Sequence, residues 1–106
     1  MYVVVAAYKL FRLRKDGSLG PLFINRHLRV LIGEWISAED HPTPGFAHRP
    51  GWHVSLQPIA PHLSPRNRVW AQVEVEDYVE LVRPARQGGI WLIAQKMRVL
   101  GLFSTN

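Results

Sequence analysis

The 106-residue chain has no cysteine. This absence excludes disulfide bonds, zinc–thiolate centres and thiol nucleophiles. Because small secreted domains commonly depend on disulfide bonds, we expect the protein to be cytoplasmic.

Long apolar runs are absent as well. No stretch reaches the roughly 18 residues that a membrane-spanning helix needs. The apolar segment 2–7 has no basic residue before it and runs directly into Lys9, which is not the pattern of a secretion signal. We therefore expect a protein with no membrane partner.

Acidic residues are few. Eight Asp and Glu stand against 13 Lys and Arg, which gives a formal net charge of +5. A basic balance favours acidic partners such as nucleic acid or nucleoprotein complexes. The apolar content of 47% is ordinary for a globular chain, and the length fits a single domain over residues 1–106.

Eight prolines and eight glycines divide the chain into short elements, which argues against long helices. Residues 2–15, rich in Val, Tyr and Phe, are expected to form a strand. Asp16 and Gly17 supply a turn, and residues 21–24 are expected to return. Residues 8–25 are therefore predicted to form a hairpin.

The middle of the chain is rich in proline. Residues 39–50 have the composition of a loop, and residues 51–56 are predicted to form a short strand. Residues 58–63 have room for one helical turn at most, because Pro61 interrupts them.

The clearest pattern lies in residues 69–82. Apolar and polar residues alternate there: Val69, Ala71, Val73 and Val75 against Trp70, Gln72, Glu74 and Glu76. This period of two predicts a strand with one apolar face. Residues 87–89, Gln-Gly-Gly, are expected to turn the chain into a last strand over residues 90–102, although a helix over 90–100 would also place its apolar residues on one face.

The fold class predicted from these elements is α+β, mainly β. We expect a small antiparallel sheet curled into a barrel or half-barrel, with one or two short helices in the middle of the chain.

Four of the five histidines lie within 22 residues, close to two carboxylates: His41, His48, His53 and His62, near Glu39 and Asp40. Imidazole and carboxylate groups bind zinc or iron, and a loop can bring them together. Their spacing matches no metal-binding motif, so we expect no metal and no cofactor.

Two copies of an H-x-S pattern occur, at His53-Val54-Ser55 and His62-Leu63-Ser64. On a strand this spacing places His and Ser on one face, where the pair could hold and protonate a phosphodiester. The pattern resembles the two-histidine phosphoesterases, but here the copies are only nine residues apart. His53, His62 and Ser55 are the candidate catalytic residues.

Cationic side chains surround two of the predicted strands, and one tryptophan accompanies them. The candidate binding residues are Arg12, Arg14, Lys15, Arg66, Arg68 and Trp70. Arginines can hold phosphates, and an aromatic side chain on the polar face of a strand can stack on a base. Gln72 and Glu74 share that face and would discourage phosphates.

Several segments carry a family resemblance: residues 8–12 (YKLFR), 20–24 (GPLFI), 49–53 (RPGWH), 60–64 (APHLS), 68–70 (RVW) and 73–78 (VEVEDY), then Gln87-Gly88-Gly89-x-Trp91 and Ala94-x-Lys96-Met97. Over about residues 8–99 the chain resembles a family of small, uncharacterised bacteriophage and prophage proteins. The resemblance implies a phage or mobile-element origin, with action inside a bacterial host, and assigns no catalytic residues.

The segment 51–63 also faintly resembles small domains of the ADP-ribosyltransferase type. In those domains a residue of the first strand holds the dinucleotide and a later Glu performs the chemistry. The resemblance implies Arg12 for the first role, and Glu74 or Glu76 for the second.

Three functions remain open. The leading expectation is a non-enzymatic phage accessory protein that binds an acidic macromolecule, either nucleic acid or a host nucleoprotein complex, as anti-CRISPR inhibitors do. The first alternative is a small enzyme that acts on a nucleotide or phosphodiester through the region of His53 and His62. The second is a structural or assembly protein that forms a homodimer through an edge strand at residues 2–7.

Overall fold

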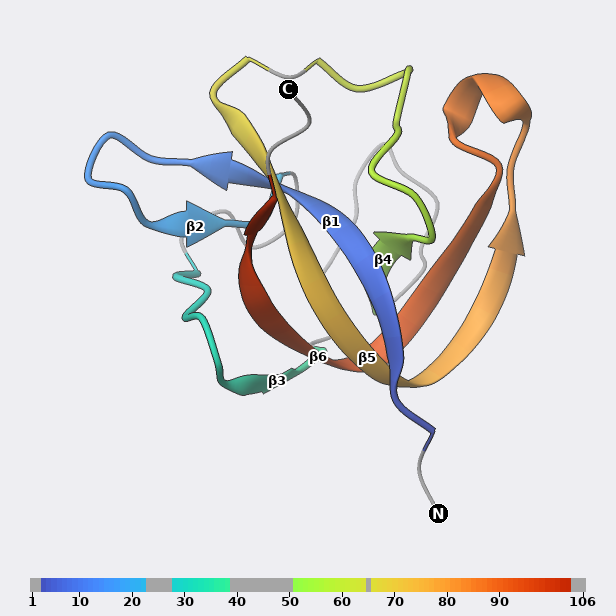
Figure 1. Cartoon of the computed structure of the whole chain (residues 1–106), viewed down its shortest axis with the longest axis horizontal. Helices are drawn as coiled ribbons and strands as arrows, with labels where there is room; N and C mark the ends of the chain where they lie inside the picture. Colours follow the sequence, from blue (N-terminus) through green and yellow to red (C-terminus); the bar gives the residue numbers. More distant parts are fainter. Residues whose placement is uncertain (1–2, 23–27, 39–50, 65, 104–106) are drawn as a thin grey trace.

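The computed structural model describes residues 3–22, 28–38, 51–64 and 66–103. Within them the chain is mainly β, as predicted. Six strands form one sheet, and every pair of neighbours is antiparallel (Figure 1): β1 (Val5–Leu13), β2 (Leu19–Gly20), β3 (Trp35–Ser37), β4 (Trp52–Ser55), β5 (Arg68–Val82) and β6 (Ile90–Phe103).

The described residues of the middle of the chain contain none of the expected helices. Among the described residues the only helical segment is η1 (Ala85–Gln87), a 3-10 turn at the tip of the β5–β6 hairpin. Residues 58–63 form bends and turns instead, because Pro58 and Pro61 have no N–H to donate. The α+β prediction is therefore wrong in its helical part. The predicted loop at residues 39–50 lies outside the described residues.

Four strands, β1, β5, β6 and β4, pair with one another in a closed ring. β5 pairs with β1 from Arg68 to Val75 and with β6 along most of its length. β6 also pairs with β4, and β4 meets β1 where Ser55 lies opposite Tyr8. β3 pairs with the second half of β6, and β2 with the end of β1. The long β5 and β6 bend strongly along this ring, as Figure 1 shows.

The period of two in β5 sets the core. Ala71, Val73 and Val75 are fully buried, and each faces a residue of β1 in the pairing register. The buried cluster is completed mainly from β1, β4 and β6: Ala7, Phe11, Leu19, Val30, Trp52, Val54, Leu92, Ala94, Met97 and Val99. Since alternate residues point to opposite faces, Trp70, Gln72 and Glu74 lie on the outer face.

Both predicted hairpins are present, with one difference in register. Gly88 and Gly89, with φ of 97° and 78°, reverse the chain between β5 and β6, so the strand interpretation of residues 90–102 is confirmed. In the first hairpin Gly17 (φ 86°) makes the turn, but the returning strand is Leu19–Gly20 and not residues 21–24. Of those residues, 23–24 lie outside the described part of the chain.

β5 loses one of its two partners near Asp77, which has a left-handed φ of 54°. Its pairing with β1 ends at Val75, while its pairing with β6 continues from Tyr78 onward. Past the bend the alternation of buried residues is lost, and Val79 and Val82 are exposed. Aspartate tolerates this backbone conformation better than a β-branched residue does.

We therefore predict that Asp77→Val lowers the free energy of unfolding by about 1–2 kcal/mol, because a β-branched side chain is strained at this φ. Asp77→Gly removes the same carboxylate without strain and should leave stability unchanged or raised. Urea denaturation of the two variants makes the comparison, and equal midpoints would contradict it.

Candidate nucleic-acid interface

Cationic side chains gather where β1 ends and β5 begins. Arg12 lies directly opposite Arg68 in the β1–β5 register. The Leu13 N–H donates to the Asn67 carbonyl at 2.9 Å, which fastens the turn after β1 to the turn before β5. Three predicted binding residues therefore lie together at this end, Arg12, Arg66 and Arg68, and a fourth, Lys15, follows in the turn two residues after Leu13. We call this group the basic end.

The turn before β5 positions two of these arginines. Asn67 is left-handed, with a φ of 57°. The backbone N–H of Arg66 donates to Ser64 Oγ at 3.2 Å, and Arg68 Nη1 donates to the Ser64 carbonyl at 3.0 Å. The turn thereby places an exposed Arg66 beside the half-buried Arg68.

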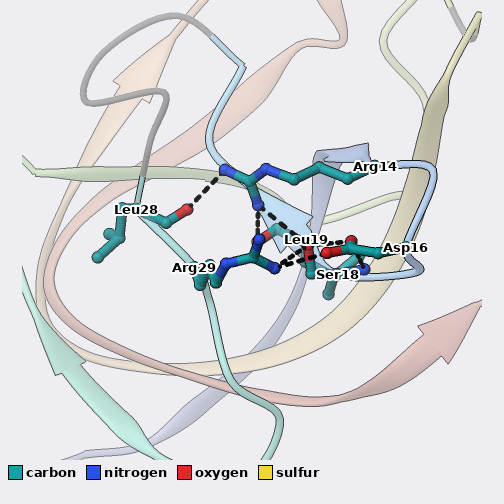
Figure 2. A network of polar contacts seen from close by, with 6 residues as sticks. All are labelled: Arg14, Asp16, Ser18, Leu19, Leu28 and Arg29. Atoms are coloured by element: carbon teal, nitrogen blue, oxygen red, sulfur yellow. Dashed lines mark hydrogen bonds and ion pairs between the residues drawn. The ribbon is translucent and has the colours of Figure 1, made fainter.

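Arg14, another predicted binding residue, makes hydrogen bonds within the fold. Its guanidinium donates to the carbonyls of Leu19 at 2.8 Å and Leu28 at 3.0 Å, so it ties β2 to the segment that begins at residue 28 (Figure 2). It also lies flat over Gly20, where an added Cβ would stand 2.5 Å from Arg14 Nη2. Arg14 supports the fold of the basic end, and the absence of a side chain at Gly20 makes room for it.

The carboxylate nearest to the basic end is held by neighbours of its own. Asp16 accepts hydrogen bonds from the Ser18 hydroxyl at 2.7 Å, the Ser18 N–H at 3.0 Å and Arg29 Nη1 at 2.9 Å (Figure 2). The bonds from Ser18 and then from Arg29 hold the Asp16 pKa well below its usual range. Arg29 therefore offsets this negative charge next to Lys15.

Two of the four carboxylates of β5 lie opposite cations of β6. Glu74 forms an ion pair with Arg98, and Glu76 lies directly opposite Lys96. The Arg98 guanidinium also lies 5.0 Å from the ring centroid of Trp35. The concern that Glu74 would repel phosphates is therefore reduced, because its charge is offset by Arg98.

Trp70 lies on the outer face, as predicted, and is half-buried. In register it stands between Leu10 of β1 and Phe103 of β6. The Phe103 ring in turn packs on Tyr8, with 5.1 Å between ring centroids. Sequence reasoning missed Tyr8 and Phe103 as members of this site. The signal for Tyr8 was its position, two and four residues before Leu10 and Arg12 on one face of a strand.

The candidate catalytic residues lie on β4 and in the segment that follows it, and Ser55 stands opposite Tyr8 of β1. His53 stands opposite Ile93, and Ser55 opposite Trp91. Ser55 is fully buried, and its Oγ accepts a hydrogen bond from the Gln57 N–H at 3.3 Å. A buried hydroxyl in this state is poorly placed to attack or hold a substrate.

His62 is exposed and packs edge-on against the ring of Trp91, with 6.0 Å between centroids. Desolvation lowers the pKa of His62, and the positive charge of Arg83 lowers it further. Residues just after β4 and residues at the β5–β6 turn line a groove of about 300 Å³: Leu56, Gln57, Gly88, Gly89 and Ile90. This lining contains no titratable side chain, so the groove offers no acid or base.

The residues implied for ADP-ribosyl transfer are far apart. Arg12 pairs with Arg68, whereas Glu74 pairs with Ala6, so the two sites are separated by six positions along the strands. At 3.3 Å per residue this is about 20 Å. The described residues also hold no cluster of three side chains able to bind a metal ion. His41 and His48 lie outside the described residues.

Lys9 was not singled out from the sequence, yet its position is unusual. It falls on the inward phase of β1, opposite Ala71. Its ammonium donates to the His53 carbonyl at 2.8 Å and lies 5.8 Å and 5.9 Å from the rings of Phe11 and Trp52. Burial of this ammonium lowers the pKa of Lys9 to about 8. Lys9 thereby bridges β1 and β4 where only one residue pair joins them.

Comparison with known proteins gives no match: no family model, curated protein or solved structure resembles the chain significantly. The resemblance to phage and prophage proteins therefore stays a prediction. No helix in the described part of the chain is long and apolar enough to cross a membrane.

Gly20→Ala should lower the free energy of unfolding by about 1–3 kcal/mol, because the new methyl group displaces the Arg14 guanidinium from its two carbonyl partners. In an Arg14→Ala background the same change should cost little. Chemical denaturation of the two single variants and the double variant measures this coupling. Additive costs would show that Gly20 does not act through Arg14.

Lys9 should make stability depend on pH. Its pKa of about 8 is below the unfolded value near 10.5, so the folded state releases its proton first and wild-type stability gains from Lys9 as pH rises through this interval. Relative to wild type, Lys9→Met should therefore lose about 2 kcal/mol of stability between about pH 7 and about pH 10. Lys15→Met, which removes an exposed lysine, is the control. A flat difference for Lys9→Met would contradict the burial of the charge.

Proposed function

We propose that the protein is a non-enzymatic binder of nucleic acid whose basic end contacts the phosphates. The observation that carries this proposal is that Arg12, Arg66 and Arg68 lie together at one end of the sheet, with Lys15 in the adjoining turn. Phosphate contacts by Arg and Lys release counterions, and this release supplies most sequence-independent affinity.

The distribution of charge supports the same conclusion. Asp16 is offset by Arg29, and Glu74 by Arg98. These pairs offset nearby carboxylates that would otherwise compete for the cations of the basic end.

The expected phage or prophage role fits a small binder of this kind. We take the ring of strand pairings as the small barrel predicted from the sequence, and the host nucleic acid as its target. Binding to an acidic host protein in place of nucleic acid is the competing outcome of the experiment below.

The two other functions have less support. The enzyme requires Ser55 or its neighbours to reach a substrate, and Ser55 is buried. The homodimer requires an edge at residues 2–7, but one side of β1 is paired with β5 from Val5 onward. Only the opposite side of the first residues of β1 remains for that contact, so the homodimer stays a prediction.

The test is the salt dependence of binding to a labelled oligonucleotide, measured by fluorescence anisotropy. Four phosphate contacts predict a slope of log Kobs against log salt of about −3 for a single strand. Arg66→Gln should reduce the slope by about 0.7 with little loss of stability, because the Arg66 side chain is exposed and the hydrogen bond to Ser64 Oγ comes from its backbone.

Arg86→Gln is the matched control, since Arg86 is exposed on the distant β5–β6 hairpin. It should leave the slope unchanged. Binding that ignores salt, equal effects of the two variants, or retention on an acidic protein with no affinity for oligonucleotides would overturn the proposal.

A further inference from the structure

The outer face continues from the basic end into a row of aromatic rings. Directly opposed residues of antiparallel strands point to the same face, and so do residues two apart on one strand. The row after Arg12 and Arg68 is Leu10, Trp70 and Phe103, and the next is Tyr8, Gln72 and Gly101. Cations and rings therefore occupy neighbouring rows of one surface.

The rings are both fixed and accessible. Tyr8 and Phe103 pack at 5.1 Å with an angle of 59° between ring planes. Tyr8, Trp70 and Phe103 are each half-buried, while Leu10 beside Trp70 is only 5% exposed despite lying outside the core cluster. The rings thus cover apolar surface with one part and present another to solvent. Fixed rings lose little conformational entropy on binding.

The surface also has space beside the rings. Gly101 stands opposite Gln72, and a Cβ added at Gly101 would meet no atom within 4 Å. Gly101 lies two residues before Phe103 on β6 and on the same face. A flat group can therefore approach the rings from the solvent side without displacing a side chain.

The spacing of the rows suits a nucleotide. Rows two residues apart are separated by about 7 Å along the strand. A base stacked on Trp70 would accordingly leave its phosphate within reach of Arg68 and Arg12, one row away. Base-on-ring stacking is worth roughly 1–3 kcal/mol per base and tolerates any base.

We infer that the nucleic acid is single-stranded, and that its bases stack on the surface formed by Tyr8, Trp70 and Phe103 while its phosphates contact the basic end. The inference rests on the proposed function, which supplies the phosphate contacts. A duplex hides its base faces in its own stack, so only an unpaired strand can use these rings. Base identity should matter little, because stacking uses the ring face that every base presents.

The experiment compares three ligands of matched length: oligothymidylate, the same backbone without bases, and a duplex. We expect oligothymidylate to bind at least about tenfold more tightly than the abasic strand, as one stacked base would give. Trp70→Ala should remove that difference, and Trp70→Phe should retain most of it. Trp35→Ala is the control, because Trp35 lies over Arg98 at another strand.

Gly101→Ile supplies a second variant that does not weaken the core. Its side chain enters open space and should block stacking while thermal stability stays close to wild type. Abasic strand or duplex bound as tightly as oligothymidylate would overturn this inference and leave the proposed function standing. Failure of all three ligands to bind would overturn the proposed function itself. Unchanged binding by Gly101→Ile and Trp70→Ala would also contradict the stacking surface.

Discussion

The period of two in β5 is the constraint on which the rest of the structure depends. Ala71, Val73 and Val75 fill the core, and a shift of one residue would bury Trp70 and Glu74 in their place. Because β5 pairs with both β1 and β6, its register also sets theirs. The alignment of outer rows from strand to strand, and with it the candidate interface, follows from this one apolar alternation.

The same register sorts the charges. The first part of β5 carries Arg68 opposite Arg12, whereas its later carboxylates meet cations of β6, as Glu74 meets Arg98. Arg14 and Arg29 are used within the fold, one on backbone carbonyls and one on Asp16. The basic end is therefore smaller than the sequence suggested. One of its members, Arg68, also holds a turn, because it donates to the Ser64 carbonyl before β5.

Local patterns predicted the elements whose causes are local. The alternation at 69–82 and the glycines at 88–89 gave β5, β6 and their turn correctly, because side-chain period and backbone freedom act over a few residues. The features that the sequence did not predict depend on partners far away in the chain. Leu19–Gly20 became the returning strand through pairing with Arg12 and Leu13, and Arg14 reaches a carbonyl fourteen residues away. Lys9 occupies an inward position of β1, where the alternation of apolar and polar residues predicts an apolar side chain. Its presence there is explained by its hydrogen bond to the carbonyl of His53 in another strand.

The central claim is that one outer surface, from the basic end to Tyr8, binds a single strand of nucleic acid. The most direct measurement is the change in backbone amide NMR shifts as oligothymidylate is added to the ¹⁵N-labelled protein. The account predicts the largest changes in residues 8–12, 66–72 and 101–103, with little change around His62 or in η1. Shifts concentrated at the β5–β6 hairpin, or spread evenly over all exposed cations, would contradict it.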